Sequence, residues 1–235
     1  MKRVLVLGWC LAAAGVAWGQ PIARVEAVAS PPPKVVLHTG DLIFQISRSP
    51  QSRAIQAATG ARWSHVGLLF QVDQRWQVLE AVQPVRYTPL EAWVARGDGR
   101  RAVVKRLRNR TLTQEEQASL RRVGEGYLGR PYDLAFGWSD THIYCSELVY
   151  KVYQRALGVP IGQLVALRTF DLEHPEVKPL LRRRYGTKVP LDELVVSPAA
   201  LFDDPDLVEV GEVKHPSERS TPRIQNPFRQ RKHAP

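Results

Sequence analysis

The spacing of apolar residues predicts two helices in the middle of the chain. Over residues 139–158 the apolar side chains recur on one helix face: Leu148, Val149, Val152, Tyr153 and Ala156. Gly158 ends this pattern, as glycine ends many helices. Residues 111–129 also have helical spacing, and Thr113 with Glu116 forms a capping box at the start of the second helix.

Shorter apolar runs predict a β-hairpin and a further strand. Residues 64–72 and 76–82 are strand-like, and Asp73 and Gln74 form a tight turn between them. Residues 101–108 give another strand. Because residues two apart on a strand share a face, the hairpin fixes which side chains lie opposite each other.

The remaining segments favour a mixed fold of the α+β class. Ser49 can cap a short helix that Pro50 begins and Gly60 ends. Residues 161–210 have a mixed pattern, and we expect them to form a peripheral strand and loops that close the domain. Strands and helices interleave without the repeating β-α-β order of a parallel sheet, which indicates α+β.

The start of the chain has the pattern of a signal peptide. A short basic start, an apolar run over residues 4–16 and a small-x-small triplet that ends at Gly19 predict a leader over residues 1–19, cleaved before Gln20. The run is shorter than the roughly 20 residues that a membrane-spanning helix needs. We therefore expect an exported protein, either periplasmic or secreted.

Composition divides the rest of the chain into three parts. Residues 20–35 are a Pro-rich linker, residues 36–210 the folded domain, and residues 211–235 a basic tail that we expect to be disordered. The formal charge is +10 for the full chain and +8 without Lys2 and Arg3. This charge suits an anionic membrane or an acidic polymer as a partner, whereas the expected export argues against nucleic acid.

Cys145 is the one cysteine that remains after the predicted leader, which contains Cys10, is removed. Such a cysteine forms an intermolecular disulfide, is buried and inert, or is reactive. Cys145 lies in the first turn or two of the predicted helix over residues 139–158, where free backbone N–H groups and the helix dipole lower a thiol pKa. This position favours a nucleophile, although a cysteine that merely packs under the helix would fit it too.

His65 is the candidate base for this thiol, because it begins a predicted strand next to Gly67. His142 lies closer in sequence, and His142-x-x-Cys145 resembles half a zinc site. The mature chain offers neither a second cysteine nor a partner histidine at ligand spacing. No metal ion or other cofactor is therefore predicted.

The predicted hairpin brings Glu80 close to His65. Counting back from the turn, Gly67 faces Glu80 and His65 faces Val82. Glu80 is then diagonal to His65 on the same face, where it can orient the imidazole. A hairpin shifted by one residue would move Glu80 to the other face, and a solvated surface carboxylate is the alternative interpretation.

Together these segments resemble one family. GDLIF, WSHVGLLF, VLEAV, YTPLEAWV and GRPYDLAFGWSDTHIYCSELVYKVY occur in the order seen in permuted papain-like amidases of the YiiX type. These proteins look like circularly permuted relatives of NlpC-type cell-wall cysteine peptidases and of lecithin:retinol acyltransferase-like proteins. The resemblance covers residues 36–159 well, and VSPAALFDDPDLVEV resembles the closing segment of the family.

The resemblance implies a circularly permuted papain-like fold, in which an antiparallel sheet packs against the helix of the nucleophile. It implies that Cys145 is the nucleophile, His65 the base and Glu80 the orienting third residue. Four further residues match positions that line the substrate site, unless they only pack: Tyr144, Tyr132, Asp133 and Trp63.

Three functions are compatible with these residues. The first is a hydrolase that cleaves an amide or ester of a peptide, cell-wall or lipid acyl substrate through a thioester, without a cofactor. The second is a lipid acyltransferase, in which an amine or alcohol replaces water. The third is a protein that binds lipid or peptide on this scaffold without catalysis.

Overall fold

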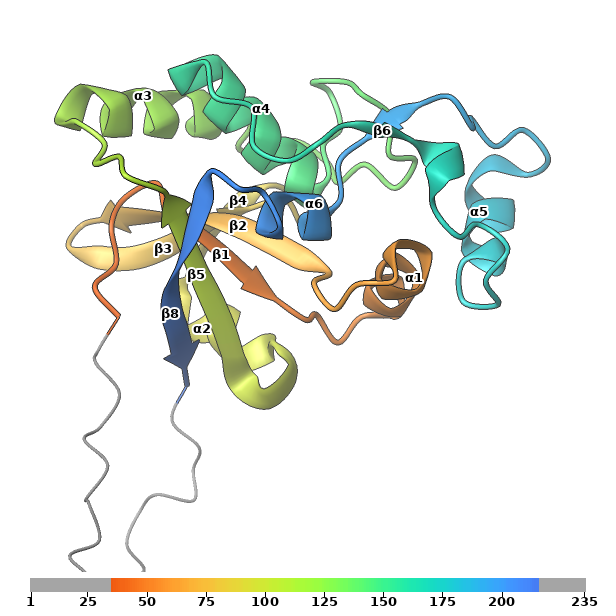
Figure 1. Ribbon diagram of the computed structural model, residues 1–235, viewed down its shortest axis with the longest axis horizontal. Helices are drawn as coiled ribbons and strands as arrows, with labels where there is room; N and C mark the ends of the chain where they lie inside the picture. Colours follow the sequence, from red (N-terminus) through yellow and green to blue (C-terminus); the bar gives the residue numbers. More distant parts are fainter. Residues whose placement is uncertain (1–34, 216–235) are drawn as a thin grey trace, which may run out of the picture. The chain divides into compact units, whose positions relative to one another are not determined.

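A six-stranded antiparallel sheet forms the centre of residues 35–215, the part of the chain that the computed structural model describes (Figure 1). The strand order is β4 (Arg86–Pro89), β3 (Arg75–Glu80), β2 (His65–Val72), β1 (Leu42–Gln45), β5 (Arg101–Leu107) and β8 (Leu207–Lys214). The predicted leader, almost all of the linker and residues 216–235 of the tail lie outside the described residues and stay predictions.

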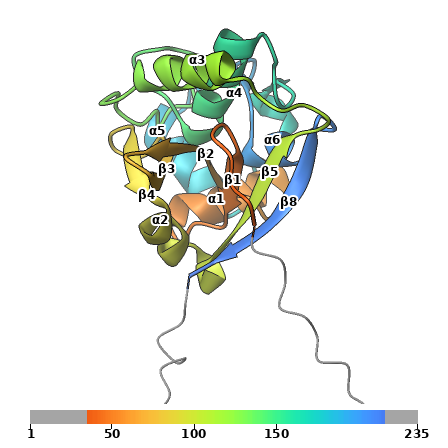
Figure 2. The ribbon, with the colours of Figure 1, turned by 90° about the vertical axis from the view of Figure 1, so that its left-hand side faces the viewer.

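Helices cover both faces of this sheet (Figure 2). α3 (Gln114–Glu125) and α4 (Cys145–Leu157) lie over one face, and α2 (Leu90–Arg96) lies over the other. The face under α4 holds the larger apolar core, which includes Leu68 of β2 and Leu148 of α4. Among residues 35–215, no helix is both long enough and apolar enough to span a membrane.

A smaller group of elements lies beside one end of the sheet, at the right in Figure 1. Here α1 (Pro50–Thr59) and α5 (Lys178–Tyr185) meet through a separate apolar cluster built around Ala54, Val177 and Leu181. The other short elements are η1 (Asp98–Arg100), β6 (Val165–Ala166), η2 (Leu167–Thr169), β7 (Leu194–Val195) and α6 (Pro198–Phe202). With so few buried apolar residues between them, α1 and α5 are expected to separate more easily than α3 and α4.

The hairpin of β2 and β3 has the predicted register. Val72 pairs with Arg75 across a turn at Asp73 and Gln74, whose φ angles of 48° and 60° suit a two-residue hairpin turn. The pairing continues to Leu68 opposite Leu79. The last residue of β3 therefore points to the face that the sequence predicts.

Helix ends also agree with the sequence. The Ser49 hydroxyl accepts a hydrogen bond from the first turn of α1, and Gly60 ends this helix in the left-handed conformation. The predicted capping box of α3 is present. α4 begins at Cys145 itself and ends at Leu157, and its C-cap Gly158 is again left-handed.

The prediction of a peripheral strand in residues 161–210 is confirmed by β8, whereas the prediction that loops form the rest of this region was wrong. β8 pairs with β5 over its whole length, with a register shift between Val104 and Lys105, so this region supplies an edge strand of the central sheet. It also contains helices, and the basic run Arg182–Arg184 lies in α5. β8 continues to Lys214, past the predicted domain end. Strands β5 and β8 lie about a hundred residues apart in the chain, and a short apolar run does not indicate which distant strand will pair with it.

Candidate active site

Glu80 is a fully buried carboxylate surrounded by hydrogen-bond donors. Its Oε1 accepts a hydrogen bond from Thr88 Oγ1 at 2.6 Å, and its Oε2 accepts one from Trp93 Nε1 at 2.9 Å. Oε2 also lies 2.6 Å from His65 Nε2 and forms an ion pair with Arg96. Burial raises a carboxyl pKa, but His65 and Arg96 outweigh burial and lower the pKa of Glu80 to about 2. The alternative of a solvated surface charge was wrong.

His65 is held by the residues around Glu80. It is the first residue of β2 and is almost fully buried, and its ring stacks on Trp93 with a centroid distance of 5.7 Å. Because Nε2 faces Glu80, Nδ1 is left to face Cys145. Both the ring orientation and the tautomer are thus set from the Glu80 side.

Cys145 is a buried free thiol at the first helical position of α4. Burial raises a thiol pKa, but the hydrogen bond to His65 and the charge of His65 act in the opposite direction. Backbone N–H groups of Val66 and Ser146 add to this effect, so the pKa of Cys145 is lowered.

The two groups therefore favour a charged pair. Burial lowers a histidine pKa, yet hydrogen bonds to Cys145 and Glu80 raise the pKa of His65 to about 9. The thiol pKa is lowered and the imidazole pKa is raised, so the contact between the two groups favours a thiolate beside an imidazolium. Such a thiolate is the reactive form of cysteine.

Tyr132 places a phenol beside the thiol. Its hydroxyl oxygen accepts a hydrogen bond from Gln51 Nε2 at 2.8 Å. Burial, together with contact with Cys145, raises the pKa of Tyr132 well above its usual value. The phenol thus keeps its proton, and because Gln51 occupies the oxygen as a donor, that proton is free to point toward Cys145.

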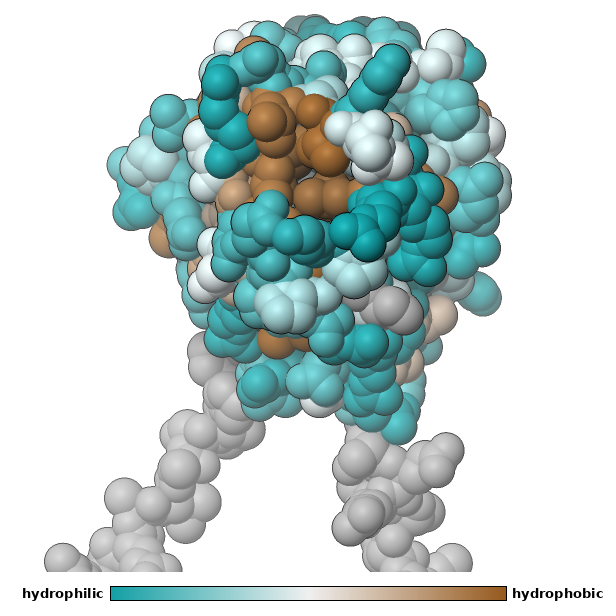
Figure 3. Space-filling model, turned by 90° about the vertical axis from the view of Figure 1, so that its right-hand side faces the viewer, coloured by the Kyte–Doolittle hydropathy of each residue, from teal (hydrophilic) through white to brown (hydrophobic). Residues whose placement is uncertain are grey.

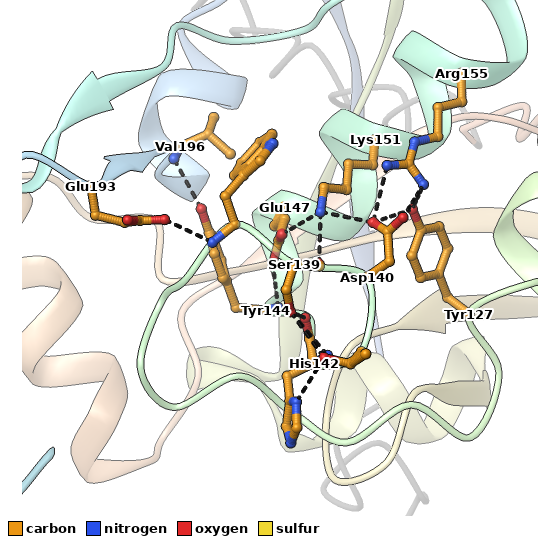
Figure 4. Close-up of polar contacts among 12 residues, drawn as sticks. Tyr127, Ser139, Asp140, His142, Tyr144, Glu147, Lys151, Arg155, Glu193 and Val196 are labelled. Carbon is orange, nitrogen blue, oxygen red and sulfur yellow. Dashed lines mark hydrogen bonds and ion pairs between the residues drawn. The ribbon is translucent and has the colours of Figure 1, made fainter.

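The segment before Cys145 is fastened to α4 by a group of charged side chains (Figure 4). Lys151 Nζ lies 2.7 Å from Glu147 Oε1 and 3.0 Å from Asp140 Oδ1, and it donates to the Ser139 carbonyl at 2.7 Å. Arg155 pairs with the outer side of Asp140. These contacts fix the loop that leads into the thiol.

Tyr144 is anchored in the core rather than turned toward solvent. Its backbone N–H donates to Glu147 Oε2 at 3.2 Å, and its hydroxyl accepts a hydrogen bond from the Val196 N–H at 3.2 Å (Figure 4). On the other side of the thiol, the Ser146 hydroxyl donates to the Val196 carbonyl at 2.8 Å. Both neighbours of Cys145 are therefore braced by the same residue.

Two cavities meet near the thiol. An open groove of about 990 Å³ is lined by His65, Tyr132, Asp133 and Arg96 among other residues, most of them polar. A smaller pocket of about 80 Å³ is lined by Cys145, Tyr132, Tyr144 and mainly apolar side chains. Of the described residues predicted to line the site, Trp63 alone lines neither cavity, because it packs in the core against Phe44 and Phe202.

Three residues of the site were not predicted from the sequence: Thr88, Trp93 and Arg96. A signal existed for two of them, since Trp93 and Arg96 are three residues apart and share a face of α2. What the sequence does not reveal is that this face packs on the side of the sheet to which Glu80 points. Thr88 is brought there by the pairing of β3 with β4.

Metal binding is not supported by the donor groups of the described chain. Among residues 35–215, no three or more His, Cys, Asp or Glu side chains are grouped so that they could hold a metal ion. His65 also directs its two ring nitrogens to different partners, Glu80 and Cys145.

Comparison with known proteins identifies a family that matches most of the chain. The family model of the permuted papain-like amidase enzymes (YaeF/YiiX, C92 family) matches residues 36–211. The uncharacterized protein YiiX of Escherichia coli is 51% identical over 172 residues, which are 73% of this chain and 85% of that protein. A crystal structure of YiiX from Escherichia coli, described as a metalloprotein, superposes on this chain with a TM-score of 0.72 at 49% sequence identity. The superposition covers 75% of this chain and 97% of the YiiX chain. The chain therefore belongs to the family of permuted papain-like amidase enzymes.

Proposed function

We propose that the protein is an exported cysteine hydrolase that cleaves an amide or ester bond through Cys145, His65 and Glu80. The observation that carries this proposal is geometric: the buried thiol at the start of α4 contacts His65, and His65 Nε2 lies 2.6 Å from the buried Glu80 carboxylate. The lowered pKa of Cys145 and the raised pKa of His65 accord with this contact. A buried cysteine that only packs under a helix has no need of a charged histidine. The family match supports the reaction class.

Each residue has a distinct role in the proposed reaction. The Cys145 thiolate attacks the carbonyl carbon, and the imidazolium of His65 gives its proton to the leaving amine or alcohol as the bond breaks. This leaves a thioester on Cys145 and a neutral imidazole. Water then attacks the thioester, His65 takes its proton, and the acid departs as the thiolate and imidazolium are restored. Glu80 stays ionised throughout and orients His65.

The negative oxygen of the tetrahedral intermediate needs donors that are in place beforehand. The first turn of α4 supplies free backbone N–H groups next to the thiol. The Tyr132 phenol, oriented by Gln51, is a second donor within reach of the reacting carbonyl.

Circular permutation is part of the same proposal. In papain-like enzymes the helix of the cysteine precedes the strand of the histidine, whereas here the order along the chain is His65, Glu80, Cys145. The contact between β2 and α4 supplies the same neighbourhood in the opposite chain order. Export rests on the predicted leader over residues 1–19.

The first test is alkylation of Cys145 by iodoacetamide as a function of pH. We expect the wild type to react with a midpoint well below roughly 8.5, the usual thiol value, and His65→Ala to return the midpoint toward it. Mass spectrometry of the labelled peptide gives the rate. A wild-type midpoint near 8.5, or one that His65→Ala leaves unchanged, would contradict the proposal.

Turnover is then measured for the wild type and for the variants Cys145→Ala and His65→Ala. Cys145→Ala should abolish hydrolysis and leave the thermal midpoint close to that of the wild type, while His65→Ala should lower kcat/KM by about 10²- to 10⁴-fold. A folded Cys145→Ala variant with full activity would refute the mechanism. Product analysis with a competing amine separates hydrolysis from acyl transfer, because a transferase passes most of the acyl group to a small amount of amine, whereas a hydrolase still releases mainly the acid.

A further inference from the structure

We propose that the outer side of α5 binds the phosphate groups of anionic phospholipids and docks the protein on a membrane surface. The basic face that does this consists of Lys178, Arg182 and Arg183, with Pro175 and Pro179 between them and before them. The proposed hydrolysis uses none of these side chains. The inference therefore goes beyond the proposed function and does not depend on it.

The basic face follows from the amphipathic pattern of α5. Lys178, Arg182 and Arg183 are exposed, and their side chains line one open cavity of about 420 Å³ at the surface. Val177, just before the helix, and Leu181 are buried in the cluster that α5 shares with α1. One side of the helix is thus fixed to the protein, and the cations point outward.

Most of this positive charge is not neutralised within the protein. Among residues 35–215, Lys178 alone of the three cations has an ion pair, with Glu173. Both partners are more than half exposed, and a pair of this kind contributes little. The side chains of Arg182 and Arg183 have no ion pair or hydrogen bond to this part of the chain. Both guanidinium groups can therefore bind an external anion.

Helix stability does not explain all three cations. Lys178 is the first residue of α5, where the helix dipole disfavours a cation, and no acidic residue lies in this turn. Lys178 and Arg182 are four residues apart, so their like charges repel. Arg182 and Arg183 lie in the last turn, where a cation does suit the dipole. A ligand that carries negative charge makes the whole set favourable.

Exposed leucines beside the basic face favour a membrane over a soluble polyanion. Leu191 and Leu194 lie on the segment that runs from α5 into β7, and they are 47% and 50% exposed. Leu134 is 54% exposed and precedes Ala135, whose carbonyl accepts a hydrogen bond from Tyr185 at the end of α5. Cations next to exposed apolar side chains are typical of surfaces that lie in the interface of an anionic membrane. A polyanion in water offers no apolar contact to a leucine.

The basic face lies on the side of the molecule that also carries the active site. Figure 3 shows this side, which is at the right of Figure 1, and a hollowed hydrophobic patch is visible there within a hydrophilic surround. Leu180 and Arg184 of α5 belong to the wall of the cavity that Cys145 lines. A membrane bound at the outer side of α5 therefore lies next to the catalytic thiol.

Sedimentation of the full chain with phospholipid vesicles tests the inference. Vesicles in which about a third of the lipid is phosphatidylglycerol should bind the protein at least about tenfold more tightly than vesicles of phosphatidylcholine alone, and added salt should weaken this binding. Cys145→Ala should bind as tightly as the wild type, because docking does not use the thiol. Equal binding to both kinds of vesicle, or loss of binding in Cys145→Ala, would overturn the inference.

Matched pairs of arginine variants locate the binding. Arg182→Gln with Arg183→Gln should weaken binding to the anionic vesicles by at least about tenfold, because each basic residue near such a surface contributes about fivefold. Arg75→Gln with Arg122→Gln removes the same charge from exposed residues of β3 and α3, which lie on the other side of Figure 1. This control pair should change binding by less than about threefold. Equal losses in two folded pairs would indicate attraction by net charge alone and would contradict docking through α5.

Soluble polyphosphate separates a membrane from an acidic polymer. Leu191→Ser should weaken vesicle binding by about fivefold, because a half-exposed leucine that inserts among lipids removes apolar surface from water. It should leave the binding of polyphosphate unchanged. Leu128→Ser changes an exposed leucine after α3 and should leave both affinities unchanged. Vesicle binding that Leu191→Ser does not alter, with polyphosphate bound as tightly as the vesicles, would identify a polyanion as the partner and refute membrane docking.

Discussion

Glu80 and Glu147 are both fully buried carboxylates next to a cation, yet their pKa values move in opposite directions. The pKa of Glu80 falls to about 2. Burial raises the pKa of Glu147 to about 7, because its bonds to Lys151 and to the Tyr144 N–H do not compensate for the loss of water. The two sites lie on opposite faces of one sheet.

The difference comes from the number and kind of donors. Glu80 has a hydroxyl, an indole N–H, an imidazole and a guanidinium around it, whereas Glu147 has one ammonium and one backbone N–H. A carboxylate that must orient His65 through every step needs a fixed charge, and four donors provide it. A carboxylate that only fastens a loop can titrate near neutral pH. Burial alone therefore does not identify the functional acid.

The largest expected effect is on stability, from removing the cation beside Glu147. Lys151→Met leaves a buried carboxylate without its ammonium, and we expect unfolding free energy at pH 8 to fall by about 3 kcal/mol or more. Urea unfolding monitored by circular dichroism measures it.

The control for this prediction is the double variant Glu147→Gln with Lys151→Met. It should recover most of the loss, because the uncompensated charge is then absent. A double variant as unstable as Lys151→Met would show that the other contacts of the ammonium, with the Trp138 ring, Asp140 and the Ser139 carbonyl, matter more than its pairing with Glu147.

The next effect is on catalysis, from neutralising the carboxylate beside His65. Glu80→Gln removes the charge that holds the imidazolium, so we expect kcat/KM to fall by about 10²-fold, or roughly 2.7 kcal/mol of barrier. The high-pH limb of the activity profile, expected near pH 9 in the wild type, should move to lower pH because the pKa of His65 falls.

Glu147→Gln serves as the comparison for that variant. It touches neither His65 nor the sulfur, so the loss should be under tenfold and the high-pH limb should stay in place. A shift of the limb in Glu147→Gln but not in Glu80→Gln would reverse the roles assigned to the two carboxylates.

The smallest expected effect is a slope of stability with pH. Because the folded pKa of Glu147 is about 7 and its unfolded value 4.5, the folded state binds the extra proton between these values. Stability from this group is therefore lost as pH rises, by about 2 kcal/mol between pH 5 and pH 7. Urea unfolding of wild type and Glu147→Gln across this range should differ by that slope, and parallel curves would contradict the raised pKa.

The part of the site that could be predicted from the sequence depends on local geometry. A two-residue turn at Asp73 and Gln74 fixes the register of β2 and β3, and the register alone places Glu80 beside His65. The position of Cys145 at the start of α4 follows in the same way from the helical pattern and the glycine that ends it.

The remainder depends on contacts between distant segments, which periodicity does not encode. Arg96 reaches Glu80 only because α2 folds back over the sheet, and β8 becomes an edge strand only because β5 offers a free edge. The sequence did not indicate the buried ion pair of Glu147 for another reason. It lies within the apolar face of α4, and its partner Lys151 is one turn further along the same helix.

The hydrogen bonds between Val196 and both neighbours of Cys145 have a consequence for how the protein is made. Tyr144 and Ser146 both bond to Val196, which lies nearer the end of the chain than His65, Glu80 and Cys145. A chain that carries these three residues but ends before Val196 thus lacks the hydrogen bonds that hold the start of α4. Maturation of the thiol must therefore wait for the final segment, and a chain that terminates early would be synthesised with its reactive residues present but not yet assembled.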